Sequence, residues 1–116
     1  MKGLRLACWQ DGWEEVYPGV RRWVTSGEFM TVTFYEFDPG SRFPLHAHDQ
    51  EQAVVVTRGA LTFSTGEEEE TVVPNAVLWI PPGVPHEAVA GPEGASVVSV
   101  VSPARRSGED LQILGA

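Results

Sequence analysis

All three histidines of the chain lie in two short motifs whose spacing suits a metal ion. His46 and His48 form a His-x-His pair, and His86 follows a proline-rich loop at 81–85. On a β-strand, residues i and i+2 point to the same side about 6.6 Å apart, so both imidazoles can reach one ion at ~2.0–2.1 Å. A loop stiffened by proline would bring the third imidazole to a fixed place. The pattern therefore favours a shared divalent cation over three unrelated polar histidines.

The residues alone leave a fourth ligand open. Glu51 and Gln52 both follow the His-x-His pair, and a carboxylate would be the stronger ligand. Gln52 has the parity of His48, yet a continuous strand would carry it about 13 Å away. Either Gln52 is no ligand, or the chain turns at 49–51 and returns Gln52 on the next strand. The apolar run at 53–56 fits the second option.

Short segments rich in β-branched and aromatic residues, separated by turn residues, make up most of the chain. Twelve glycines and nine prolines among 116 residues predict many short elements rather than a few long helices. We expect strands at 22–25, 28–37, 52–57, 60–64, 71–73, 77–80, 87–90 and 96–101. This spacing is typical of an all-β sandwich or barrel, here one domain over residues 1–116. Residues 107–114 could add a short C-terminal helix.

Several aromatic residues must find a partner surface. Trp9 and Trp13 lie in an N-terminal segment that should dock either on a sheet edge or on a second subunit. Trp79 stands between two aliphatic residues and is expected in the core. Tyr35 and Glu36 alternate along one strand, so only one of them can face the barrel interior.

Composition excludes several classes of function. The net charge of −8 disfavours binding to nucleic acid or to an anionic membrane, because phosphates would be repelled. The single cysteine, Cys8, rules out an internal disulfide or a Cys-based zinc motif and is expected to be a buried thiol. No stretch approaches the roughly 20 apolar residues of a membrane span, and the N-terminus lacks an apolar signal core. We expect a cytoplasmic protein.

The two histidine motifs resemble those of the cupin superfamily. The first cupin motif, a glycine followed by His-x-His, an acidic or amide residue and a later glycine, is matched by Gly40, His46, His48, Gln52 and Gly59. The second motif, Pro-x-Gly-x-x-His, is matched by Pro81, Gly83 and His86, with Asn75 where a glycine usually opens it. The resemblance implies a small double-stranded β-helix, or jelly-roll barrel, over about residues 28–102. It also implies a homodimer.

In the cupin subgroup with His-x-His-x-x-Glu-Gln, the glutamine amide oxygen completes the ligand set. The resemblance therefore implies that a divalent metal is held by His46, His48, Gln52 and His86. The metal could be nickel, zinc, iron, manganese or copper, because imidazole and amide oxygen suit all of them.

A closer resemblance is to small cupins of pectin and alginate breakdown that linearise unsaturated uronates. It is carried by residues 16–22, 46–52 and 80–86 and by the tail at 100–105. Aligned on the tail, Arg105 matches the family arginine, while the family's catalytic aspartate falls on Ser99 and its phenylalanine on Val101. Serine cannot supply the general acid or base that a carboxylate provides.

Such a site would act on a small anionic substrate. Neutral ligands leave the charge of the ion uncompensated, which favours a carboxylate or an enediolate in the open positions. Arg42 and Arg105 could hold a substrate carboxylate, the alternatives being a solvent-facing turn residue and a salt bridge. The expected function is a metal-dependent enzyme of the uronate linearisation or isomerisation type, acting on a sugar-derived or carboxylate substrate. The alternatives are a metal-dependent dioxygenase and a non-catalytic module that binds a small ligand.

Overall fold

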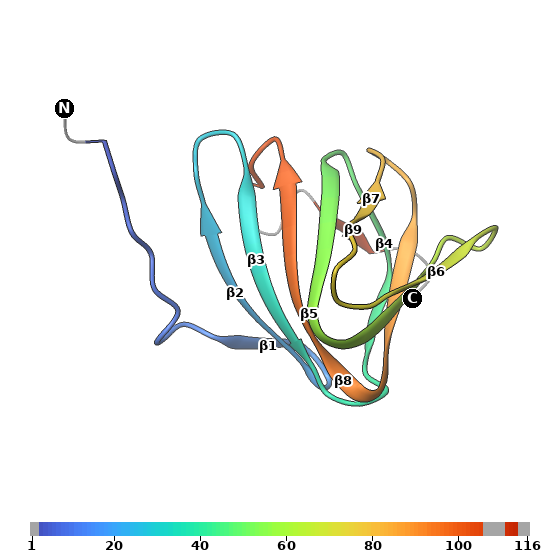
Figure 1. The fold of residues 1–116 in the computed structure, drawn as a ribbon. Coiled ribbons are helices and arrows are strands. Elements are labelled where there is room, and N and C mark those ends of the chain that lie inside the picture. Colours follow the sequence, from blue (N-terminus) through green and yellow to red (C-terminus); the bar gives the residue numbers. More distant parts are fainter. Residues whose placement is uncertain (1–2, 106–110, 114–116) are drawn as a thin grey trace.

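Nine β-strands make up the regular structure of the described part of the chain (Figure 1). The structure is a computed structural model and describes residues 3–105 and 111–113. The strands are β1 (Glu14–Tyr17), β2 (Val20–Ser26), β3 (Thr31–Phe37), β4 (Arg42–His48), β5 (Glu51–Ser64), β6 (Glu69–Val72), β7 (Leu78–Ile80), β8 (His86–Ser102) and β9 (Leu111–Ile113). The described residues contain no helix with the length and apolar character needed to cross a bilayer.

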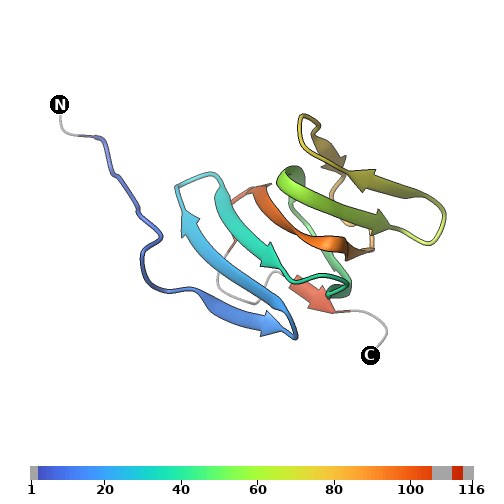
Figure 2. The same ribbon diagram turned by 60° about the horizontal axis from the view of Figure 1, so that its bottom comes forward.

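The strands form the two packed sheets of a jelly roll, as the cupin resemblance implies (Figure 2). One sheet runs β1-β2-β3-β8-β5-β7 and uses the second half of β8 and the first half of β5. The other runs β9-β4-β8-β5-β6 and uses the opposite halves of the two long strands. The strands expected separately at 52–57 and 60–64, and at 87–90 and 96–101, are thus the two halves of β5 and β8.

Glycines allow both long strands to bend where the sheets meet. Gly59 and Gly94 adopt φ of 77° and 74°, a region that other residues rarely enter. A Cβ at Gly59 would lie 2.0 Å from the Gly94 carbonyl oxygen, so the two backbones approach too closely for any side chain. Burial alternates along each strand but shifts by one residue at these bends. Residues 52, 54 and 56 face inward before the bend in β5, and 61 and 63 do so after it.

The interior is filled by the inward rows of both sheets. Its buried apolar members include Phe37, Phe43, Val54 and Leu61. On β3 the inward residue is Tyr35, which is 8% exposed, whereas Glu36 lies on the opposite face. The apolar rows end where β4, β5 and β8 carry polar buried residues instead.

Two sequence predictions about burial are wrong. Trp79 is 63% exposed, because it pairs with Ala53 on the outer face of the sheet while its neighbour Ile80 takes the inward position. Cys8 is exposed, because it precedes β1 in the N-terminal segment, which extends away from the barrel (Figure 1). That segment does dock in part on a sheet: the Trp9 ring stacks on Phe34, with centroids 4.6 Å apart.

The chain also differs from its prediction near the C-terminus. Leu111–Ile113, within the stretch expected as a short helix, is strand β9 and pairs antiparallel with β4. The open edge of β4 offers backbone donors and acceptors that a helix could not use, so a paired strand is favoured there. The rest of that stretch lies outside the described residues.

Candidate metal centre

The three histidines converge inside the barrel from two neighbouring strands. His46 and His48 lie on the inward face of β4 and are each 5% exposed, and His86, at 1%, begins β8 directly opposite His46. The ring centroids of His46 and His86 lie 4.2 Å apart, and the ring of His48 lies 5.7 and 5.1 Å from them. One candidate ligand atom from each residue lies within 4.8 Å of the others. One ion can therefore contact all three.

Backbone carbonyl groups orient each imidazole. Nδ1 lies 2.7 Å from the Pro44 oxygen in His46, 3.0 Å from the Gln50 oxygen in His48, and 2.8 Å from the Val84 oxygen in His86. A carbonyl only accepts, so each Nδ1 carries the proton and donates it, which leaves the Nε2 lone pair free. The buried Nε2 of His86 has no hydrogen-bond partner. The three imidazoles are therefore in the tautomer that metal binding through Nε2 requires.

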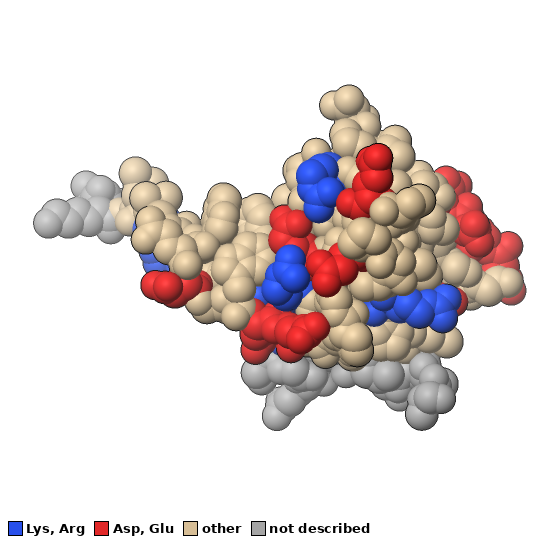
Figure 3. Space-filling model, turned by 90° about the horizontal axis from the view of Figure 1, so that it is seen from below, with Lys and Arg blue, Asp and Glu red and all other residues tan. Residues whose placement is uncertain are grey.

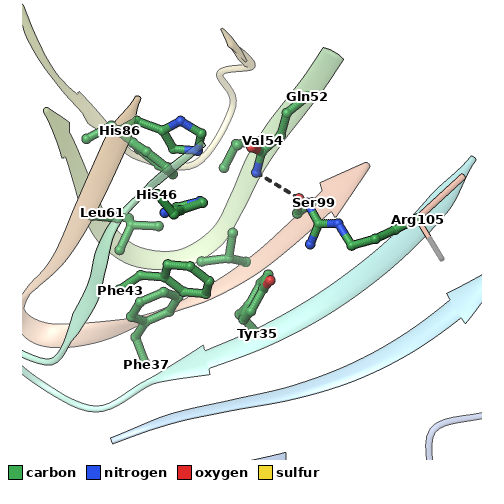
Figure 4. Close-up of a pocket in the computed structure, with 13 residues that line it drawn as sticks. Tyr35, Phe37, Phe43, His46, Gln52, Val54, Leu61, His86, Ser99 and Arg105 are labelled. Atoms are coloured by element: carbon green, nitrogen blue, oxygen red, sulfur yellow. Dashed lines mark hydrogen bonds between the residues drawn. The ribbon is translucent and has the colours of Figure 1, made fainter. Parts of the chain in front are cut away.

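Gln52 adds a fourth acceptor from β5, the next strand along the chain. β4 ends at His48 and β5 begins at Glu51, so the chain does turn before Gln52 and bring it back beside the pair. Its Oε1 lies 2.9 Å from the Nε2 of His48, and its Nε2 donates to Ser99 Oγ at 2.9 Å (Figure 4). Two acceptors thus face each other with no proton between them, an arrangement that a cation stabilises. If the amide turned over, Ser99 could still donate to it, so a bound cation would select the orientation with Oε1 toward the histidines.

Burial keeps these imidazoles neutral. Desolvation, followed by the nearby His86, lowers the pKa of His46 to about 3. Desolvation also lowers the pKa of His86 to about 4 and that of His48 below its usual range. Neutral lone pairs are therefore available at pH 7 without competition from protons. Three neutral imidazoles and one amide oxygen fit a divalent cation, and they do not distinguish among nickel, zinc, iron, copper and manganese.

The pocket beside the histidines is narrow and largely apolar. It has a volume of about 30 Å³, and Phe43, Leu61, Tyr35, Ser99 and Arg105 form part of its wall (Figure 4). Among the described residues that line it there is no carboxylate. Burial raises the pKa of Tyr35, and the guanidinium groups of Arg105 and Arg22 partly oppose that effect. The phenol therefore stays protonated at neutral pH and can donate a hydrogen bond into the pocket.

The structure separates the two arginines expected at the site. Arg105 lines the pocket, and its buried Nε has no hydrogen-bond partner. Its backbone N–H donates to Thr31 Oγ1 at 2.8 Å, which anchors the chain after β8. Arg42 is exposed at the start of β4 and does not line the pocket. Glu51, the alternative fourth ligand, is also exposed.

Sequence reasoning missed three features of this site. It left the inward face of β3 undecided and so did not assign Tyr35. It did not select Arg22, which pairs in register with Tyr35. It treated Ser99 only as a missing aspartate, whereas Ser99 accepts the hydrogen bond that orients Gln52. The one available signal for Arg22 was that residues facing each other across β2 and β3 lie on the same face of the sheet. Using it required the register of the two strands, which the sequence does not specify.

Comparisons with known proteins agree with this geometry. The model of the cupin domain family matches residues 33–101. KdgF from a Halomonas species is 25% identical, with a TM-score of 0.79 over 91% of this chain and 97% of that one. An RmlC-like cupin from Shewanella frigidimarina is 26% identical, with a TM-score of 0.75 over 84% and 87%. The polyketide cyclase RemF from Streptomyces resistomycificus shares the fold, with a TM-score of 0.74 at 23% identity over 99% and 87%.

No curated protein sequence matches the chain. The family match covers more than half of the chain, and it includes β4, β5 and β8, the strands that carry the histidines. On this match and this fold, the chain belongs to the cupin family.

Proposed function

We propose that this cupin is a metal-dependent enzyme acting on a small anionic substrate, a sugar-derived acid or another carboxylate, by linearisation or isomerisation. The observation that carries the proposal is that His46, His48, Gln52 and His86 present lone pairs of electrons close together. An arginine lies on the same pocket wall. The resemblance of the motifs to uronate-linearising cupins supplies the substrate class.

The chain's own residues divide the work as follows. The three histidines and Gln52 would hold a divalent ion, which when bound supplies Lewis acidity for a carbonyl or enediolate oxygen. Arg105 binds the substrate carboxylate through its guanidinium group. Tyr35, protonated and buried on the same wall, donates a proton or a hydrogen bond. The apolar wall excludes water and strengthens these interactions.

The test is incubation of the metal-loaded protein with 4,5-unsaturated galacturonate, followed by NMR. The ring vinyl proton should disappear faster than with the His48→Ala variant, which lacks one ligand. Equal rates for the two proteins would refute the proposal. Metal analysis of anaerobically purified protein, with and without EDTA, identifies the ion in the same preparation.

A second candidate is a non-catalytic module that binds a small ligand. It is favoured by Ser99 at the position of the family's catalytic aspartate and by the absence of carboxylates among the described residues of the pocket wall. Saturable binding of an unsaturated uronate to the metal-loaded protein, without any loss of the vinyl signal, would select this reading.

We also propose a single cupin domain over residues 1–116 that forms a homodimer. Leu4 and Leu6 are 105% and 89% exposed in a segment that extends away from the barrel, and a second copy would cover them (Figure 1). Light scattering after size exclusion should give the dimer mass, and a monomer in the Leu4→Ser/Leu6→Ser variant. A monomeric wild-type protein would contradict this. A cytoplasmic location would fit the unpaired thiol of Cys8, and cell fractionation tests it.

On the face shown in Figure 3, acidic and basic side chains are interspersed rather than gathered into a basic patch. Together with the net charge of −8, this supports a small-molecule ligand in preference to nucleic acid.

A further inference from the structure

A second groove adjoins the metal pocket on the inner side of β2 and β3. It has a volume of about 320 Å³, and its walls carry Arg22, Ser26, Thr31, Thr33 and Arg105. Arg105 lines both this groove and the metal pocket, so the two spaces meet at its side chain. The groove thus carries a second guanidinium group, that of Arg22, which does not line the metal pocket.

The metal pocket offers far less free volume than the groove. Its volume is about 30 Å³, about a tenth of that of the groove. A sugar acid whose metal-binding oxygen atoms enter the pocket therefore finds most of the space for its remaining atoms in the groove. The adjoining groove, at about 320 Å³, is large enough for them.

Arg22 is positioned to bind a ligand in that groove. It stands opposite Tyr35 in the β2–β3 register and faces the same side of the sheet. The guanidinium groups of Arg105 and Arg22 both act to lower the pKa of Tyr35, against the larger effect of its burial, so both cations lie near this phenol. Nε of Arg22 contacts Glu14 Oε1 at 2.9 Å, which leaves its terminal nitrogens for Tyr35 and a ligand.

The positive charge at this junction is incompletely balanced. Glu14 is the one acidic residue among the described groove residues, and its side chain is 60% exposed, so solvent screens its attraction for Arg22. The buried Nε of Arg105 has no acceptor at all. An anion entering the groove would supply the acceptor that Arg105 Nε lacks and a second partner for Arg22, in the paired geometry that arginine favours.

We infer that Arg22 and Arg105 together bind the carboxylate of an elongated hydroxylated acid, whose body lies in the groove while its distal oxygen atoms reach the metal pocket. This inference rests on the proposed function for the class of substrate, and it assigns Arg22 as a residue that determines specificity. The ligand class is an acid whose carboxylate is set apart from the oxygen atoms at the metal.

The experiment compares binding of D-galacturonate and of its neutral methyl ester by calorimetry, using zinc-loaded protein. The wild type should bind the acid more tightly than the ester. Arg22→Gln should weaken binding of the acid by about tenfold to a hundredfold and leave the ester unchanged, because a hydrogen-bonded charge is lost. The matched control is Arg21→Gln, since Arg21 lies on the outer face, where it pairs with Asp38 at 3.5 Å, and should change neither affinity.

The Glu14→Gln variant tests whether the ion pair between Arg22 and Glu14 has only a structural role. If Arg22 serves only to hold β1 against β2, removing Glu14 should not improve binding. If Arg22 binds the ligand, removing its competing carboxylate should strengthen binding of the acid severalfold. Thermal melts check that the Arg22→Gln variant is folded. If it is not, Arg22→Lys and Glu14→Gln carry the test, with a weaker preference for the acid expected in the former.

The inference is overturned if the wild type binds no acid, if it binds acid and ester equally, or if Arg22→Gln keeps the wild-type ratio of the two affinities. Failure of the proposed function gives a different result. A protein with an Arg22-dependent preference for the acid but no loss of the vinyl signal would be a binding module rather than an enzyme. Turnover with an unchanged preference in Arg22→Gln would reject only the role of Arg22.

Discussion

The metal-free protein should lose stability in mild acid because its histidines are buried as neutral groups. The pKa of His46 falls from 6.5 to about 3 on folding, and that of His86 from 6.5 to about 4. Between pH 6.5 and those values the unfolded chain binds more protons than the folded chain, so the free energy of unfolding falls as the pH falls. Each of these two residues lowers the free energy of unfolding by about 2 kcal/mol between pH 7.5 and pH 5. Together they remove about 4 kcal/mol from a domain stability that is typically about 5–15 kcal/mol.

Urea denaturation of EDTA-treated protein between pH 7.5 and 5 measures this loss. The His86→Gln variant removes one titrating group, so its free energy of unfolding should depend less on pH by about 2 kcal/mol over the same range. The pH dependence that remains in a His46→Gln/His86→Gln variant reports His48, whose pKa is also lowered by burial, together with the carboxylates, and serves as the control. A wild-type stability that is flat down to pH 5, or a His86→Gln curve parallel to the wild type, would refute the assignment of neutral buried imidazoles.

Three further outcomes are expected. Ser99→Ala removes the acceptor that orients the Gln52 amide, so metal affinity measured by chelator competition should fall about 10–100-fold while the fold is kept; unchanged affinity would show that the bond is incidental. Gln52→Glu places a carboxylate beside His48, so the ion should bind more tightly and D-galacturonate more weakly, as calorimetry would show. Gly59→Ala forces a Cβ into the Gly94 backbone at positive φ, so urea unfolding should show a loss of at least about 2 kcal/mol; a wild-type midpoint would contradict the close approach.

The fold and the family were predictable because their signals are local and redundant. Turn residues recur along the whole chain, and Asn75, with φ of 75°, adopts the left-handed conformation that the usual glycine would take and that asparagine tolerates. The turn after His48 was foreseeable too, since an uninterrupted strand could not return Gln52 to the pair. In each case the residue type restricts the backbone directly.

The features that were missed depend on which face of a sheet a residue occupies. Trp79 is apolar and was expected inside, yet its strand has only three residues and gives the inward position to Ile80. Arg22 is charged and would ordinarily be assigned to solvent, and only its register against Tyr35 turns it toward the groove. A period of two cannot by itself say which parity is inside, so pairing between distant segments decides it.

The bends at Gly59 and Gly94 limit how this protein can vary in length. Before each bend the inward positions have even numbers, and after it they have odd numbers. Deleting one residue between the bend of β8 and Ser99 would leave the bend in place and rotate Ser99, together with the residues of its row that follow, to the outside. Variants and natural relatives with altered lengths in this stretch should therefore gain or lose residues in pairs, or else change both long strands together.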